Sequence, residues 1–352
     1  MLGNFKTICS SILDDGLSSV TLAVVNVTVN RFRWFVLLFG PFPILGASIS
    51  LTQWADGGTH AARNDAARNE VVATIDARHW QAMPHARDAE LRAACEKSAQ
   101  KLAAELGDAC DVIVRAPFVI GGDLPPEELQ RWYGRTIQPA ALALTESYLQ
   151  TTPDKPITVL LFSNRESYNA YAERLYHDRG ISVYGYYKPT IRTLIMNIGT
   201  GGGTLVHELT HAMVDFDFAD VPAWFNEGLA SLHEQCRFRQ TDERHWIEGL
   251  ANWRLAKLQE AIQDDELGTI RAMISDADFR GANVGLNYAH ARYFCMYLQQ
   301  QGKLVEFYQA FRESHRDDPT GEKTLRRVLG EDGWKTIDEP FRRWVLTLRF
   351  ER

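Results

Sequence analysis

Residues 205–214, LVHELTHAMV, place two histidines four positions apart within an apolar segment. Residues with this spacing lie on one face of a helix, so His207 and His211 can bind the same tetrahedral Zn²⁺. Glu208 points to a different side and can reach a water held by that ion. Burying such side chains without partners is costly. The stretch therefore predicts a helix that carries a catalytic metal site, with one Zn²⁺ per chain.

A third protein ligand is expected from residues 222–231, PAWFNEGLAS. Pro222 suits the first turn of a helix, and Glu227 then lies among apolar residues, where an unpaired carboxylate is unfavourable. The intervening residues 214–222, VDFDFADVP, are long enough for the chain to reverse. An antiparallel second helix would bring the carboxylate of Glu227 to the metal.

Together, HELTH and WFNEGLASLHE resemble the gluzincin zinc metallopeptidases, the superfamily of the thermolysin-like and M1 aminopeptidase families. The resemblance covers about residues 157–300 and is nearest to small bacterial members with an N-terminal membrane anchor. It implies a zincin-like fold, a peptide or protein substrate, metal ligands His207, His211 and Glu227, and Glu208 as the catalytic base. The GxMEN signature of aminopeptidases is absent from the sequence, which argues against that activity.

Relatives of this kind add an electrophile that stabilises the oxyanion. Residues 287–294, NYAHARYF, begin a helix of the type that carries it, and Tyr288 is the preferred candidate, with His290 as the alternative. Glu234 follows Glu227 by two helical turns and is a candidate to orient a ligand imidazole. His233 and His245 have no metal-ligand spacing and are expected at the surface.

Composition narrows the possible partners. The net charge of -7 and the scatter of Lys and Arg among acidic residues argue against a nucleic-acid partner. The five cysteines include no CxxC pair, so a cysteine zinc site is not expected. The four cysteines that follow the leader could pair if exported, for example Cys95 with Cys110 and Cys236 with Cys295, or remain as buried thiols.

The N-terminal segment predicts export. Residues 34–51, WFVLLFGPFPILGASISL, follow Arg31 and Arg33 and have the pattern of a signal peptide or membrane anchor. The preceding arginines favour a cytoplasmic N-terminus and a catalytic part outside the cytoplasm, anchored to the bacterial inner membrane. A buried core helix is the alternative.

The rest of the chain predicts an α+β fold in which a small mixed sheet and the motif helix pack against a mostly helical C-terminal lobe. The expected divisions are a leader (1–51), a helical spacer (52–110), an α+β lobe with the motif helix (111–221) and a helical lobe with the third ligand (222–352).

Local patterns predict the elements of the α+β lobe. Strands are expected at residues 111–120 and 157–162, and a hairpin at 183–198. Pro139 should kink or break the helix that starts at Pro125 and Pro126. The glycines at 199–203 suggest a flexible loop before a helix capped by Thr204.

The expected reaction is peptide hydrolysis by a metal-activated water, with Glu208 carrying the proton and the substrate added as a strand near residues 192–197. Three alternatives remain. The same site could hydrolyse a non-peptide amide or ester, the protein could be an inactive membrane-anchored scaffold with the same fold, or the motif could have arisen by chance.

Overall fold

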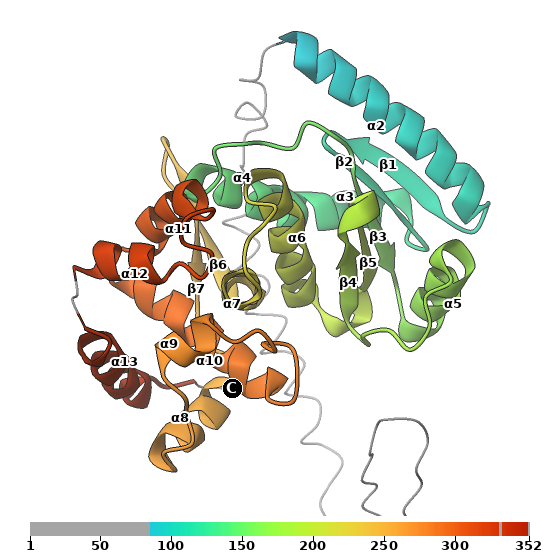
Figure 1. Cartoon of the computed structure of the whole chain (residues 1–352). Coiled ribbons are helices and arrows are strands. Elements are labelled where there is room, and N and C mark those ends of the chain that lie inside the picture. Colours follow the sequence, from blue (N-terminus) through green and yellow to red (C-terminus); the bar gives the residue numbers. More distant parts are fainter. Residues whose placement is uncertain (1–84, 331–332, 351–352) are drawn as a thin grey trace, which may run out of the picture. The chain divides into compact units, whose positions relative to one another are not determined.

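The structure is a computed structural model that describes residues 85–330 and 333–350 (Figure 1). The predicted leader, the segment 34–51 and the first part of the predicted spacer lie outside these residues. The described part is a mixed α+β structure, rich in helix, with a small mixed sheet. None of its helices is both long and apolar enough to cross a membrane.

The sheet has five strands in the order β1-β2-β3-β5-β4. Their bounds are Asp111–Arg115, Phe118–Gly122, Ile157–Phe162, Gly185–Lys188 and Thr193–Asn197 for β1 to β5. β2, β3 and β5 run parallel, while β1 and β4 are antiparallel strands at the two edges. β4 and β5 form the predicted hairpin. The single strand expected at 111–120 is instead a second hairpin, because the chain turns at Pro117, which cannot donate to a ladder.

Side chains of β3 alternate between two apolar cores, as the two-residue period of a strand requires. Val159 and Leu161 join one core, whereas Leu160 and Phe162 join the other. Helices α2 (His85–Leu106) and α5 (Arg165–Tyr176) cover the second face, and Asn164 caps α5 by accepting from two backbone N–H groups. Burial on both faces explains why residues 157–162 form a continuous apolar run.

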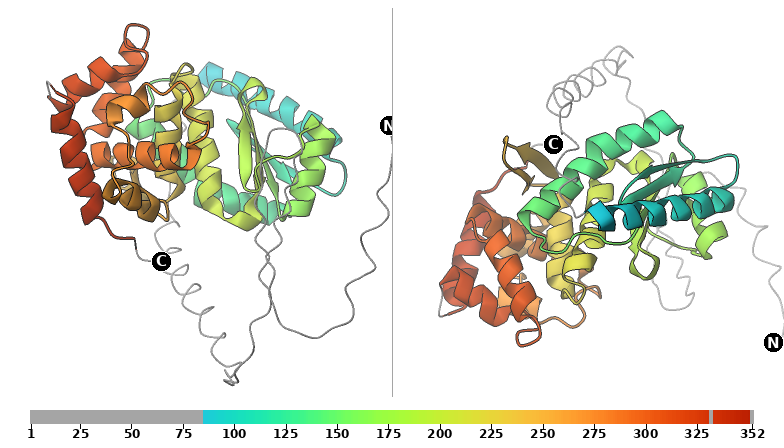
Figure 2. Two further views of the ribbon diagram at one scale, coloured as in Figure 1. Left: turned by 60° about the horizontal axis from the view of Figure 1, so that its bottom comes forward. Right: turned by 90° about the horizontal axis from the view of Figure 1, so that it is seen from above.

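The opposite face of the sheet is covered by α4 (Gln138–Ser147) and α6 (Gly202–Asp217), as the different views in Figures 1 and 2 illustrate. α3 (Pro126–Trp132) leads into α4 through a π-helical turn at Tyr133–Ile137. The α-helical pattern is therefore interrupted just before Pro139, where the sequence predicted a kink or break. Pro139 lies in the first turn of α4, where a missing N–H group is tolerated.

The start of α6 differs from the expected flexible loop. A 3₁₀ turn at Ile198–Thr200 leads directly into the helix, and Gly201 rather than Thr204 is the N-cap. Gly201 has φ of 100°, a conformation that favours glycine. A Cβ at Gly203 would lie 2.4 Å from the carbonyl oxygen of Glu234, so the glycine permits close packing between α6 and the next helix.

The remaining chain is mostly helical but not entirely so. A hairpin of β6 (Cys236–Gln240) and β7 (His245–Gly249), which the sequence did not predict, lies within the mostly helical lobe. β6 has only half-buried and exposed positions, β7 has half-buried and buried ones, and both carry charged side chains. Neither strand therefore forms an apolar run in the sequence. The helices are α7 to α13: Ala223–Glu234, Leu255–Gln263, Ile270–Ile274, Val284–Gln300, Leu304–Ser314, Glu322–Leu329 and Lys335–Thr347.

Neither of the two histidines expected at the surface is exposed, and His245 is half-buried. His233 is fully buried, within 3.4 Å of the Tyr148 hydroxyl and 3.3 Å of the Thr210 hydroxyl, and His245 contacts Glu146. His290 stacks on Phe341 in the core and does not line a cleft, which removes it as an oxyanion candidate. The four described cysteines are free thiols, two of them buried and two half-buried, which agrees with the second of the two alternatives and not with disulfide pairing.

Burial lowers the pKa of His290 to about 3, well below its ordinary value. The unfolded chain therefore binds a proton between about pH 6.5 and 3 that the folded chain excludes, and stability falls as pH decreases through this range. We predict that the His290→Phe variant loses less stability on acidification, by up to about 1.4 kcal/mol per pH unit. Urea unfolding of both proteins with a chelator at pH 6.5 and 4.5 measures this, and equal losses would contradict the prediction.

Candidate metal site

The two histidines of the motif lie together on one face of α6. The Nε2 atoms of His207 and His211 are 3.1 Å apart, and each side chain is only 12% exposed. Leu205, Leu209 and Ala212 of the same helix are buried in the core that packs on the sheet. The apolar face of α6 thus fixes the helix and directs both imidazoles toward α7.

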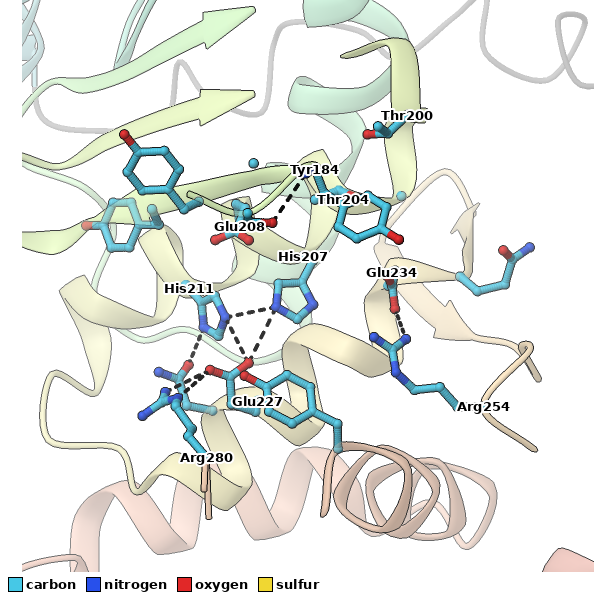
Figure 3. A pocket seen from close by; sticks show the side chains of 18 of the residues that line it. Tyr184, Thr200, Thr204, His207, Glu208, His211, Glu227, Glu234, Arg254 and Arg280 are labelled. Atoms are coloured by element: carbon cyan, nitrogen blue, oxygen red, sulfur yellow. Dashed lines mark hydrogen bonds and ion pairs between the residues drawn. The ribbon is translucent and has the colours of Figure 1, made fainter. Parts of the chain in front are cut away.

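α7 brings the carboxylate of Glu227 to the two imidazoles (Figure 3). Its Oε2 atom lies 3.5 Å from Nε2 of His207 and 3.4 Å from Nε2 of His211. One ligand atom from each of the three side chains lies within 4.8 Å of the others, a group that could hold a metal ion. The structure therefore brings together the three residues that the sequence indicated as ligands.

Electrostatics at this group favour a positive charge between the three side chains. Burial alone would raise the pKa of Glu227, but hydrogen bonds with His207 and His211 hold it well below its ordinary value. Burial lowers the pKa of His211, yet Glu227 outweighs it and the net shift is upward. A buried carboxylate that faces two imidazoles is stabilised by a proton or by a metal cation at the same place.

Asn226 and Arg280 support this group and were not identified from the sequence. The Oδ1 atom of Asn226 lies 2.8 Å from Nδ1 of His211 and fixes the orientation of the ring. Arg280 donates two hydrogen bonds, of 3.0 and 2.7 Å, to Oε1 of Glu227. Oε2 of Glu227 therefore faces the two imidazoles, while Oε1 binds Arg280.

Glu234 does not have the predicted role of orienting a ligand imidazole. Its carboxylate forms an ion pair with Arg254 instead. Seven residues bring the side chain back to the same helical face, but they also advance it by about 10 Å along the axis. Asn226 contacts His211 in its place, and Nδ1 of His207 has no hydrogen-bond partner among the described residues.

Glu208 and Tyr288 both line the cleft above the three side chains. Glu208 is half-buried and lies beside the imidazoles on the side of α6 toward the sheet (Figure 3). Burial and the nearby charge of Glu227 raise the pKa of Tyr288. The hydroxyl stays protonated at neutral pH and interacts with Glu227 and Arg280 in this structure.

The cleft has a volume of about 850 Å³ and runs between the sheet edge and the helices after α7. Three residues of β4 line it: Gly185, Tyr186 and Tyr187. The strand at the sheet edge is therefore β4, whereas the residues expected at the edge, 192–197, include the inner strand β5. β4 is held in place where the Tyr186 hydroxyl and Lys188 both donate to Asp178.

The chain matches no protein-family model and no curated protein sequence. The chemistry of the site therefore rests on its own residues. Two imidazole nitrogens and a carboxylate oxygen form a donor set that suits Zn²⁺ and leaves a coordination position for water. The geometry fits such an ion, because the donors converge from two helices whose spacing is fixed by core packing.

Loss of the Asn226 side chain should weaken metal binding without removing a ligand. We predict that Asn226→Ala lowers zinc affinity about 10- to 100-fold, because the His211 ring loses the group that orients it. Competition with a chelator of known affinity measures the change. Asn164→Ala serves as a control, since Asn164 caps α5 away from the site and its loss should reduce stability but leave zinc affinity unchanged. Equal affinities for all three proteins would contradict this role of Asn226.

Proposed function

We propose that the protein is a zinc-dependent metallopeptidase with a zincin-like fold, related in its site to the gluzincins. The observation that carries the proposal is the convergence of His207, His211 and Glu227 at the base of a cleft, with Glu208 beside them. Three ligands alone would be equally compatible with a metal that only stabilises the structure. A carboxylate next to the ligands, outside the ligand set and facing the cleft, is what hydrolysis requires in addition.

His207, His211 and Glu227 would hold the zinc ion, and Arg280 would keep Glu227 in its ligating orientation. When bound, zinc supplies Lewis acidity that lowers the pKa of a water molecule and polarises a carbonyl group. Glu208 accepts the proton of the attacking water and later delivers it to the leaving amine. The half-buried position of Glu208 restricts its access to bulk water and keeps the carboxylate available for this transfer.

Tyr288 supplies the second electrophilic contact in this proposal. Its protonated hydroxyl lines the cleft near Glu227, and it can donate a hydrogen bond to an oxyanion that develops on the substrate carbonyl. Tyr288 packs on the buried ring of Phe279, with centroids 5.8 Å apart, which limits its freedom. This rigidity favours a contact that is already in place when charge develops.

The position of β4 favours a peptide over a small amide or ester. β4 pairs with β5 on one side only and lines the cleft with its residues 185–187. An extended peptide could therefore add to the outer edge of β4 by main-chain hydrogen bonds. This replaces the strand near residues 192–197 as the proposed site of strand addition.

The proposed location of the enzyme rests on the sequence of residues 34–51. Their apolar character behind two arginines supports export, with the catalytic part held outside the cytoplasm at the bacterial inner membrane.

Zinc content tests the ligand set. We predict one zinc per wild-type chain after metal addition at neutral pH, and loss of that zinc in Glu227→Ala, because two imidazoles alone leave the ion without its anionic ligand. Metal analysis of the purified protein gives the stoichiometry. Glu105→Ala is the matched control, since Glu105 lies at the surface of α2. Zinc retained in Glu227→Ala would remove Glu227 from the ligand set.

Substitution of the proposed base tests catalysis separately from metal binding. Glu208→Gln should retain one zinc but lower kcat on a cleaved peptide by about 10²- to 10⁴-fold, because an amide cannot accept the proton of water. A peptide-library screen of the wild type provides the substrate. Full activity in a zinc-loaded Glu208→Gln sample would refute the assignment.

A further inference from the structure

Two large aromatic side chains that line the metal cleft are unusually exposed. Tyr184 is 54% exposed and Trp253 is 61% exposed, whereas the other aromatic residues of the described chain are buried or half-buried. Tyr184 directly precedes β4, and Trp253 lies between β7 and α8. An apolar surface contributed to one cleft by two separate segments is typical of a ligand-binding site.

Trp253 is held in a fixed position by its neighbour. The guanidinium of Arg254 lies over the indole ring, 4.1 Å from its centroid. Arg254 is in turn paired with Glu234, and the two side chains are only 13% and 22% exposed. The guanidinium covers one face of the ring, so the large exposure of Trp253 belongs to the remainder of the indole.

The backbone beneath Trp253 is also fixed. Asn252 is almost completely buried, and its N–H donates to the hydroxyl of Tyr293 at 2.9 Å while its carbonyl accepts from that hydroxyl at 3.0 Å. The N–H of Arg254 donates to Oδ1 of Asn252 at 3.0 Å. Hydrogen bonds on both sides of Trp253 thus hold an exposed indole in place before any ligand arrives, which lowers the entropic cost of binding.

This aromatic surface lies on one side of the metal group. Glu234 is the last residue of α7, and its carbonyl oxygen contacts the first turn of α6, one turn before His207. Figure 3 shows Tyr184, Glu234 and Arg254 on the His207 side of the cleft, while Arg280 lies on the opposite side below His211. The exposed aromatic surface therefore flanks the metal group on the His207 side.

We propose that Trp253, held by Arg254 and Glu234, is a specificity platform that stacks against an aromatic side chain of the peptide substrate next to the scissile bond. This inference rests on the proposed function and adds a substrate class to it. Aromatic rings prefer offset or edge-to-face contact with another ring, and Trp253 presents such a surface. Because Glu234 neutralises Arg254, the platform has no spare charge that would select an acidic side chain.

Binding of two matched hydroxamates to the zinc-loaded protein tests the platform without turnover. Both compounds are short peptide hydroxamates, one with a phenylalanine and the other with an alanine side chain beside the zinc-binding group. Calorimetry should give a tighter Kd for the phenylalanine compound, and Trp253→Ala should reduce this preference about threefold to tenfold. Trp253→Phe should restore most of it. Leu346→Ala, which removes another exposed apolar side chain outside the cleft, should leave it unchanged.

The outcomes separate this inference from the proposed function. Wild-type protein that binds no zinc would overturn both. Zinc-loaded wild type that binds the two hydroxamates equally well, or a preference that survives intact in zinc-loaded Trp253→Ala, would overturn the platform alone. Glu234→Gln gives an independent readout, because Arg254 loses its charged partner. It should retain one zinc and lose part of the preference for phenylalanine, and full retention of the preference would contradict the positioning role of Glu234.

Discussion

The buried carboxylate of Glu227 is the group on which the arrangement of the helical part depends. A carboxylate with so little exposure requires opposite charge and hydrogen bonds on every side. α6 supplies two imidazoles, and the segment before α10 supplies Arg280. Gly228 allows α10 to approach α7, since a Cβ there would lie 2.9 Å from the carbonyl oxygen of Ala291. α6, α7 and the turn before α10 thus all meet at the side chain of Glu227.

The same constraint explains why the three candidate ligands could be predicted from the sequence. His207 and His211 are related by helical periodicity, and Glu227 follows after a loop too short to carry the second helix far away. Their relation is local, so it does not depend on knowledge of the whole fold. The mixed sheet and its β4–β5 hairpin were predicted for a similar reason, because β-branched and aromatic runs bounded by Pro and Gly indicate strands.

Residues that contact the candidate site from distant parts of the sequence could not be predicted in this way. Arg280 lies more than fifty residues from Glu227, and nothing in its neighbourhood distinguishes it from other surface arginines. The burial of His233 depends on Tyr148, which directly follows α4, and on Thr210 of α6, so the sequence around His233 gives no sign of it. Asn226 was visible in the sequence, and the orientation of α7 could have indicated its role. Glu234 was wrongly predicted to contact an imidazole, because helical periodicity gives the face on which a side chain lies but not its position along the helix axis.

The contact between Arg280 and Glu227 has a consequence for the segment that carries it. Arg280 is 55% exposed and belongs to the turn between α9 and α10, yet it holds one oxygen of a buried ligand. Ligand orientation and order in this turn are therefore thermodynamically linked, and such linkage is reciprocal. In the proposed enzyme, a substrate that stabilises the turn would strengthen metal retention, and removal of the metal would in return make the turn exchange its amide hydrogens faster.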